Sequence, residues 1–150
     1  MNTIFVIAAV FIGTIAFSQL YGVPRSCYLS CAAAGCICWI SYSILLDPWG
    51  EVAACFGATL LVALLARWLA VRKKCPVLVF LIPGIFPMIP GAGIYWTAYY
   101  LVMDQVTQAL STGYDAVKCA VALVLGIVLA FEVPQSFFAL GDKRESKNNS

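Results

Sequence analysis

The residues best suited to chemistry lie in one proline- and glycine-rich stretch of an otherwise apolar segment. Positions 83 to 93 hold three prolines and three glycines, and a tyrosine follows: Pro83, Gly84, Pro87, Pro90, Gly91, Gly93 and Tyr95. Each proline inside a helix removes a backbone hydrogen bond and collides with the preceding turn, which costs about 3 kcal/mol. The stretch predicts a broken helix, and the N–H groups that start its second half favour an anionic ligand group. These seven residues are the candidate substrate path, and a proline-kinked span without a ligand is the open alternative.

Few other side chains could take part in a reaction. The chain has no histidine, the usual general base, and no serine or aspartate in a recognisable catalytic setting, so we do not expect an enzyme. Glu132 lies within the last apolar run and is the candidate proton carrier. The alternative, equally open, is that Glu132 reaches the membrane interface. We expect Arg67 to extend its charged end to the interface.

The seven cysteines predict close helix packing and no metal site. Five lie inside apolar runs, and Cys27 and Cys75 lie at the ends of such runs. The stretch from Cys31 to Cys38 lacks the CxxC spacing of zinc sites, and no histidine could complete one. We expect no metal and no cofactor, with cysteine serving as a small apolar residue.

The elements that must position these residues are long apolar segments. Of 150 residues, 63% are hydrophobic and only 11% are charged, and the mean hydropathy is +0.93. A soluble domain is about 25% charged, and a membrane span needs roughly 20 apolar residues. The sequence predicts an all-α polytopic membrane protein with about five transmembrane helices, the fourth broken by proline and glycine. The five runs are Thr3–Leu20, Tyr28–Leu46, Val52–Leu69, Val77–Ile94 and Val117–Leu140.

Charged residues in the predicted loops set the expected orientation. The first and third loops and the tail hold eight basic residues, whereas the second and fourth loops hold only Lys118, along with the acidic residues Asp47, Glu51, Asp104 and Asp115. By the positive-inside rule, the N-terminus lies outside the cell and the C-terminus in the cytoplasm. Residues 1–140 form one transmembrane domain, and 141–150 form a disordered cytoplasmic tail. No basic residue precedes the first run, so we expect a permanent span and not a cleaved signal peptide.

Small residues at four-residue spacing predict where helices touch, because they let backbones approach closely. Four such stripes occur: Ala9/Gly13, Cys31/Gly35, Ala53/Gly57 and Ala122/Gly126/Ala130. The contacted helix could belong to this chain or to another. The aromatic residues after the broken run suit an interfacial belt, to which Tyr95 belongs if it does not close the site.

The broken run also carries a recognisable motif. It reads Ile82-Pro-Gly-Ile-Phe-Pro87-Met-Ile-Pro-Gly91, with Tyr95 after it and a basic cluster followed by Pro76 before it. This pattern resembles the signature of the threonine/serine exporter family, and more narrowly the small C-terminal-region subunit of its split, two-component type. The segment from Phe17 to Arg25 is similar to the family's aromatic–Asn–Val–Pro turn, from which Gly22 departs. The resemblance covers about Phe17–Tyr100.

The resemblance implies proton-coupled export of small carboxylates. The fused members export threonine and serine, and the split type is associated with succinate and similar dicarboxylates. It further implies an inner-membrane location and a larger partner subunit, with a homo-oligomer left open and no role for nucleic acid. The rival hypothesis is a structural or assembly subunit without a substrate site of its own. The broken fourth run favours the exporter, because a scaffold gains little from that strain.

Overall fold

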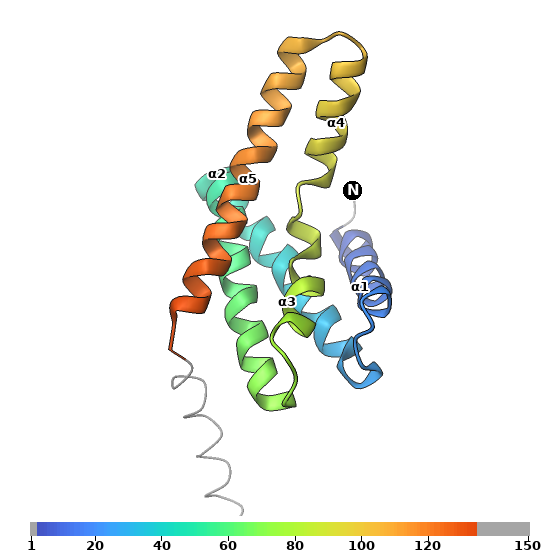
Figure 1. Cartoon of the computed structure of the whole chain (residues 1–150), viewed down its shortest axis with the longest axis vertical. Coiled ribbons are helices and arrows are strands. Elements are labelled where there is room, and N and C mark those ends of the chain that lie inside the picture. The colour runs from blue at the N-terminus through green and yellow to red at the C-terminus, as the bar shows by residue number, and fades with distance from the viewer. Residues whose placement is uncertain (1–2, 135–150) are drawn as a thin grey trace, which may run out of the picture.

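The computed structural model describes residues 3–134, and over that range the chain is all-helical, as predicted. Figure 1 shows the order of the elements. These are α1 (Thr3–Leu20), the short 3-10 turn η1 (Arg25–Cys27), α2 (Tyr28–Lys73), α3 (Leu78–Ile85), the 3-10 turn η2 (Phe86–Met88), α4 (Gly91–Val102) and α5 (Val106–Glu132). Within residues 3–134, three helices are long and apolar enough to cross a membrane, or four if the bent pair α3–α4 makes one span. The count of about five spans stays a prediction.

Two of the predicted runs lie in the single helix α2, which folds back on itself. Straight, its 46 residues would reach about 70 Å, more than twice the thickness of a bilayer core. Gly50 interrupts the helix with φ 78° and ψ 170°, a conformation that essentially only glycine adopts. The halves before and after Gly50 then pack together: a Cβ on Gly57 would lie 2.9 Å from Leu45 Cδ1. Each half is therefore about one bilayer long.

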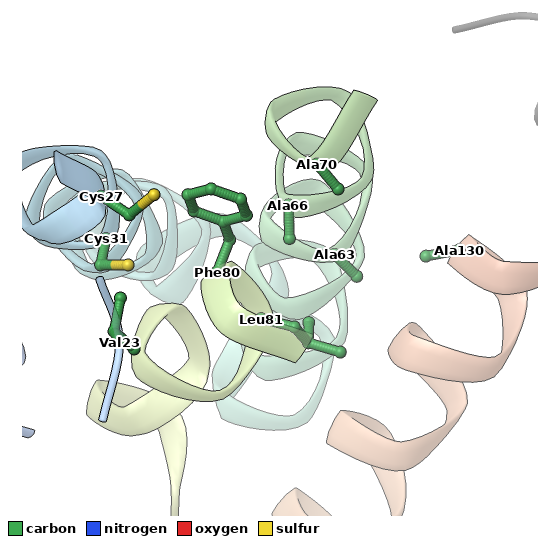
Figure 2. Close-up of a cluster of buried hydrophobic side chains, with 9 residues drawn as sticks. All are labelled: Val23, Cys27, Cys31, Ala63, Ala66, Ala70, Phe80, Leu81 and Ala130. Carbon is green, nitrogen blue, oxygen red and sulfur yellow. The ribbon is translucent and has the colours of Figure 1, made fainter. Parts of the chain in front are cut away.

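The core between these halves consists mostly of small residues. In Figure 2, Phe80 of α3 points between Cys27 and Cys31 on one side and the alanines of the second half of α2 on the other. α5 covers that second half through Ala122 and Ala130, both buried. Five of the seven cysteines are buried, which agrees with their predicted role in packing. Close approach of helix backbones thus replaces the large apolar core of a soluble protein.

Three of the four small-residue stripes lie at contacts within this chain. A Cβ on Gly35 would lie 2.5 Å from Thr14 Oγ1 of α1, and one on Gly126 would lie 3.0 Å from the carbonyl oxygen of Phe56. Gly57 makes the third contact, inside α2. The Ala9/Gly13 stripe differs, because Ala9 is exposed and a Cβ on Gly13 would meet nothing within 4 Å. That stripe is no contact face within the described residues.

The last helix is longer at its start than predicted. α5 begins at Val106 and not at Val117, so Asp115 and Lys118 lie inside the helix and form an ion pair of 2.7 Å. Their placement in a loop was wrong, because the connector is only residues 103–105, closed by Asp104 at φ 58°. The predicted stretch from Gln135 to Leu140 and the predicted tail, 141–150, lie outside the described residues.

α4 and the first half of α5 form a hairpin that extends beyond the other helices at the top of Figure 1. Glycines let the two helices approach: a Cβ on Gly93 would lie 2.9 Å from Ala116 Cβ, and one on Gly113 would lie 3.1 Å from Thr97 Cγ2. The fourth predicted run, Val77–Ile94, accordingly continues as helix to Val102.

Candidate functional site

The proline- and glycine-rich stretch forms a break between α3 and α4. α3 ends at Ile85, η2 adds one tight turn, and Ile89 is extended with ψ 123°. Pro90 has φ −75° and ψ 51°, and α4 starts at the next residue, Gly91. The two helical parts are bent by 48° relative to each other. The predicted broken helix is therefore present as two half-helices.

Contacts on the α3 side of the break satisfy the backbone. Pro83 has no N–H, so the carbonyl of Val79 loses its helical donor, and the Cys31 thiol donates to that oxygen over 3.4 Å. The Phe86 N–H donates to the Pro83 carbonyl, and the Ile89 N–H donates to the Phe86 carbonyl over 3.3 Å. Cys31 thus helps α3 to tolerate a proline in its interior.

Pro83 and Gly84 are buried where α3 packs against α2. A Cβ on Gly84 would lie 2.9 Å from Val62 Cγ1 and 3.4 Å from Ala34 Cβ, one atom from each half of α2. A side chain at position 84 would force Val62 or α3 to shift. These two predicted path residues therefore fix the position of the break.

The α4 side of the break is open. The Gly91 N–H donates to the Ile89 carbonyl over 2.7 Å, and the Ile94 N–H donates to Pro90 over 3.1 Å. As groups of the first helical turn, the N–H groups of Ala92 and Gly93 have no intrahelical acceptor. Gly91 and Ala92 are exposed, and a Cβ on Gly91 would meet nothing within 4 Å. This end of α4 carries partial positive charge, and residues 78–102 contain no charged side chain.

A shallow apolar groove of about 380 Å³ runs from the break along the α4–α5 hairpin. Pro90 lies at one end of it, and Ile94, Thr97, Ala98 and Leu101 form its α4 wall. The Thr97 hydroxyl donates to the Gly93 carbonyl over 2.7 Å, so it is already engaged within the helix. The groove suits an apolar occupant. The hydrogen-bond donors of this region are instead the backbone N–H groups at the start of α4.

Tyr95 lies apart from that groove, in a cluster of exposed aromatic side chains. It is 63% exposed and meets Trp96 edge-on, with ring centroids 5.4 Å apart. Trp96 in turn stacks on Tyr100 at 5.9 Å. The cluster has the composition of an interfacial belt, and a role of Tyr95 in the substrate path stays a prediction.

The turn that ends α1 contacts the break directly. Phe17 stacks on Phe86 of η2, with ring centroids 4.0 Å apart and planes inclined by 30°. Gly22 then reverses the chain at φ 65°, in the left-handed region that glycine and asparagine favour over other residues. Gly22 can therefore replace asparagine without changing the turn. The two segments in which the sequence resembles a known motif lie side by side.

Arg67 is a charged residue whose burial the sequence did not predict. It is only 5% exposed, so the chain itself encloses its side chain. Its guanidinium donates to the Ala130 carbonyl in the last turn of α5 and lies 5.5 Å from the ring centroid of Phe131. A usable signal was its spacing, because Ala63, Ala66, Arg67 and Ala70 share one helix face, and all four are buried.

Glu132 is the last residue of α5, and it is exposed. The fifth predicted run extends to Leu140 and so placed this carboxyl deeper in a span. Its position at a helix end fits the interfacial alternative, and its role as proton carrier stays a prediction.

Comparison with known proteins gives two matches. The profile of a family described as "Threonine/Serine exporter, ThrE" matches residues 6–133. A "Probable threonine/serine exporter" of Mycobacterium tuberculosis is 33% identical over 81 residues. That match covers 53% of this chain but only 15% of the relative. No solved structure matches the chain.

Proposed function

The chain belongs to the threonine/serine exporter family, and from that membership we propose that it is a membrane subunit of a secondary exporter of small carboxylates. The substrates are threonine and serine, or dicarboxylates of the succinate type. The subunit works with a larger partner, and export draws on the proton gradient, with Glu132 as the candidate carrier. Family membership supports the exporter role, and the local geometry supports the class of substrate.

The open N-terminus of α4 is the observation that carries the proposal. Two first-turn N–H groups, those of Ala92 and Gly93, lie at a positive helix end beside the exposed Gly91. A carboxylate accepts hydrogen bonds from such groups and is favoured by the helix dipole. Discontinuous helices of secondary transporters bind anionic substrate groups in this way. We therefore assign the substrate carboxylate to the start of α4.

The same geometry supports a larger partner. Broken backbone at membrane depth is tolerated only where it is buried in protein or lines a watery cavity. No residue of α4 is buried by the described part of the chain, so another surface must enclose the start of α4. The length of the Mycobacterium tuberculosis relative, of which the match covers 15%, allows for much additional protein. The partner completes the substrate path on the open side of Gly91.

The distribution of charge supports the proposed orientation. The connectors after α1 and α2 and the end of α5 lie at one end of the molecule, the lower end in Figure 1. Arg25 and the cluster Arg72, Lys73 and Lys74 lie in or beside these connectors. Asp104 lies in the α4–α5 connector at the other end. We place the basic end in the cytoplasm of a cell with this protein in its inner membrane.

A structural or assembly subunit is the second candidate, and the uncovered surfaces favour it. No residue of α4 is buried in the described part of the chain, and a Cβ on Gly13 of the Ala9/Gly13 stripe would meet nothing within 4 Å, so both surfaces could dock a partner without touching a substrate. The break itself contains no charged residue. On this alternative, the start of α4 is a docking surface only.

Replacing Gly91 by leucine separates the two functions. The new side chain meets open space within this chain, so it should enter the substrate path without disturbing the fold. We expect carboxylate export from cells carrying both subunits to fall to the level without the exporter, with normal abundance and normal co-purification of the partner. Gly13→Leu is the matched control, because position 13 is equally open but lies on α1. Normal export by Gly91→Leu would place the site elsewhere, and loss of the partner from either variant would favour the docking role.

A further inference from the structure

Two cysteines far apart in sequence meet at the basic end of the molecule. Cys27 closes η1, Cys75 follows the end of α2, and their sulfur atoms are 3.9 Å apart. Cys27 is 1% exposed, whereas Cys75 is only partly buried. A reagent in the surrounding solution therefore reaches the pair through Cys75. Closing the pair to the sulfur–sulfur distance of a disulfide, about 2.05 Å, requires a movement of about 2 Å.

We propose that Cys27 and Cys75 form a reversible disulfide that clamps the entry of α3 to the entry of α2. Small disulfides such as glutathione disulfide are the oxidant. The Cys75 thiolate attacks one sulfur of the small disulfide, forms a mixed disulfide and releases one thiol. The Cys27 thiolate then attacks the Cys75 sulfur and releases the second thiol. The two cysteine protons end on the two released thiols, so one disulfide is reduced for each one formed.

The position of the pair gives this disulfide a structural consequence. Cys27 directly precedes α2, and Cys75 lies three residues before α3. Phe80 and Leu81 of α3 are buried in the same cluster as Cys27, as Figure 2 shows for their side chains. A bond between the connectors fixes the start of α3, the half-helix that leads into the break. The effect of this disulfide on export rests on the proposed function, whereas the formation of the disulfide does not.

The surroundings of Cys75 set the expected rate. Partial burial raises the pKa of the Cys75 thiol, and the neighbouring Cys27 raises it further, against the opposing charge of Lys73. Little thiolate is then present at neutral pH, so exchange is slow and should speed up about tenfold per pH unit below that pKa. The pair therefore oxidises slowly at neutral pH, and faster as the concentration of oxidant rises.

The chain contains an internal comparison for this reaction. Cys55 and Cys119 are buried together in a second cluster, between α2 and α5. They are also two thiols in one cluster, but both are buried and no small disulfide reaches them from solution. Cys119→Ser therefore serves as a control that removes a buried cysteine without removing the proposed pair.

The test oxidises membrane vesicles that hold the full chain with its partner, using glutathione disulfide at mildly alkaline pH. We expect loss of two of the seven free thiols, a tryptic peptide pair joined through Cys27 and Cys75, and recovery of both thiols with dithiothreitol. Cys75→Ser should lose the cross-link, and Cys119→Ser should keep it. A stable glutathione adduct on Cys75 with Cys27 still reduced would overturn the proposal, as would two cysteines that stay reduced.

Export measured on the same vesicles tests the clamp. We expect export to drop on oxidation, to return with dithiothreitol, and to be insensitive to oxidation in Cys75→Ser. Unchanged export from fully cross-linked vesicles would refute the clamp. Absence of export from reduced vesicles would instead contradict the proposed function and leave the cross-link result standing.

Discussion

At the scale of single residues, Arg67 shows why burial of charge was not predictable from position alone. Its place near the end of an apolar run indicated a side chain that reaches water. The structure instead buries it, because the last turn of α5 packs over the alanine face on which it lies. A guanidinium has five N–H donors, and a helix C-terminus presents carbonyls that lack donors. Arg67 thereby links the end of α5 to α2.

Replacing Arg67 with methionine should destabilise the chain. The Ala130 carbonyl would lose its donor, and an unsatisfied buried acceptor costs about 1–3 kcal/mol. Arg67→Lys should recover part of this loss, because it retains one charged donor on a flexible stem. The free energy of unfolding can be measured by titration with denaturing detergent. Arg25→Met is the control, since Arg25 is exposed, and equal effects of Arg67→Met and Arg25→Met would contradict the anchoring role.

At the scale of elements, the apolar runs predicted which segments are helical but not where each ends. The break at 83–93 followed from its prolines and glycines, because their backbone chemistry is local. The start of α5 could not be predicted in this way, because the polar residues from Thr107 to Asp115 are typical of a loop. They are helical here since α4 packs against them at Gly113, a contact between distant positions. The candidate site was predictable as a segment, whereas the split between buried Pro83 and exposed Gly91 depended on tertiary packing.

The contact between α5 and α2 gives a prediction for Gly126. A Cβ there would lie 3.0 Å from the Phe56 carbonyl oxygen, 3.1 Å from the Leu60 nitrogen and 3.2 Å from Thr59 Cβ. Two of these atoms are backbone and cannot move aside alone, so Gly126→Ala should cost about 1–3 kcal/mol of folding free energy. Gly13→Ala, in open space, should be neutral or slightly stabilising. The partner bound per folded chain should be unchanged in both, and a selective loss of partner in Gly126→Ala would mean that this face contacts another chain.

At the scale of the whole molecule, the helices have large apolar surfaces that the chain does not cover. Exposed large side chains occur on every helix, from Ile4 on α1 to Phe131 on α5. On the proposed function, lipid and the partner would cover these surfaces. The buried interior is small, and the substrate carboxylate is assigned to its edge, where the chain leaves α4 open. The described part of the chain is consistent with one wall of the proposed substrate path and not with a complete path.

The number of spans and the orientation can be tested together. The reversal at Gly50 divides α2 into two lengths that each suffice for a bilayer, and the basic connectors lie at the end opposite the α4–α5 connector. Reporter proteins inserted at Gly50 and at Asp104 should therefore both report the exterior, and a fusion after Ser150 should report the cytoplasm. An insertion at Lys74 is the matched internal control and should report the same side as Ser150. If Gly50 and Lys74 reported the same side, the second half of α2 would not cross the membrane, and the five-span arrangement would be wrong.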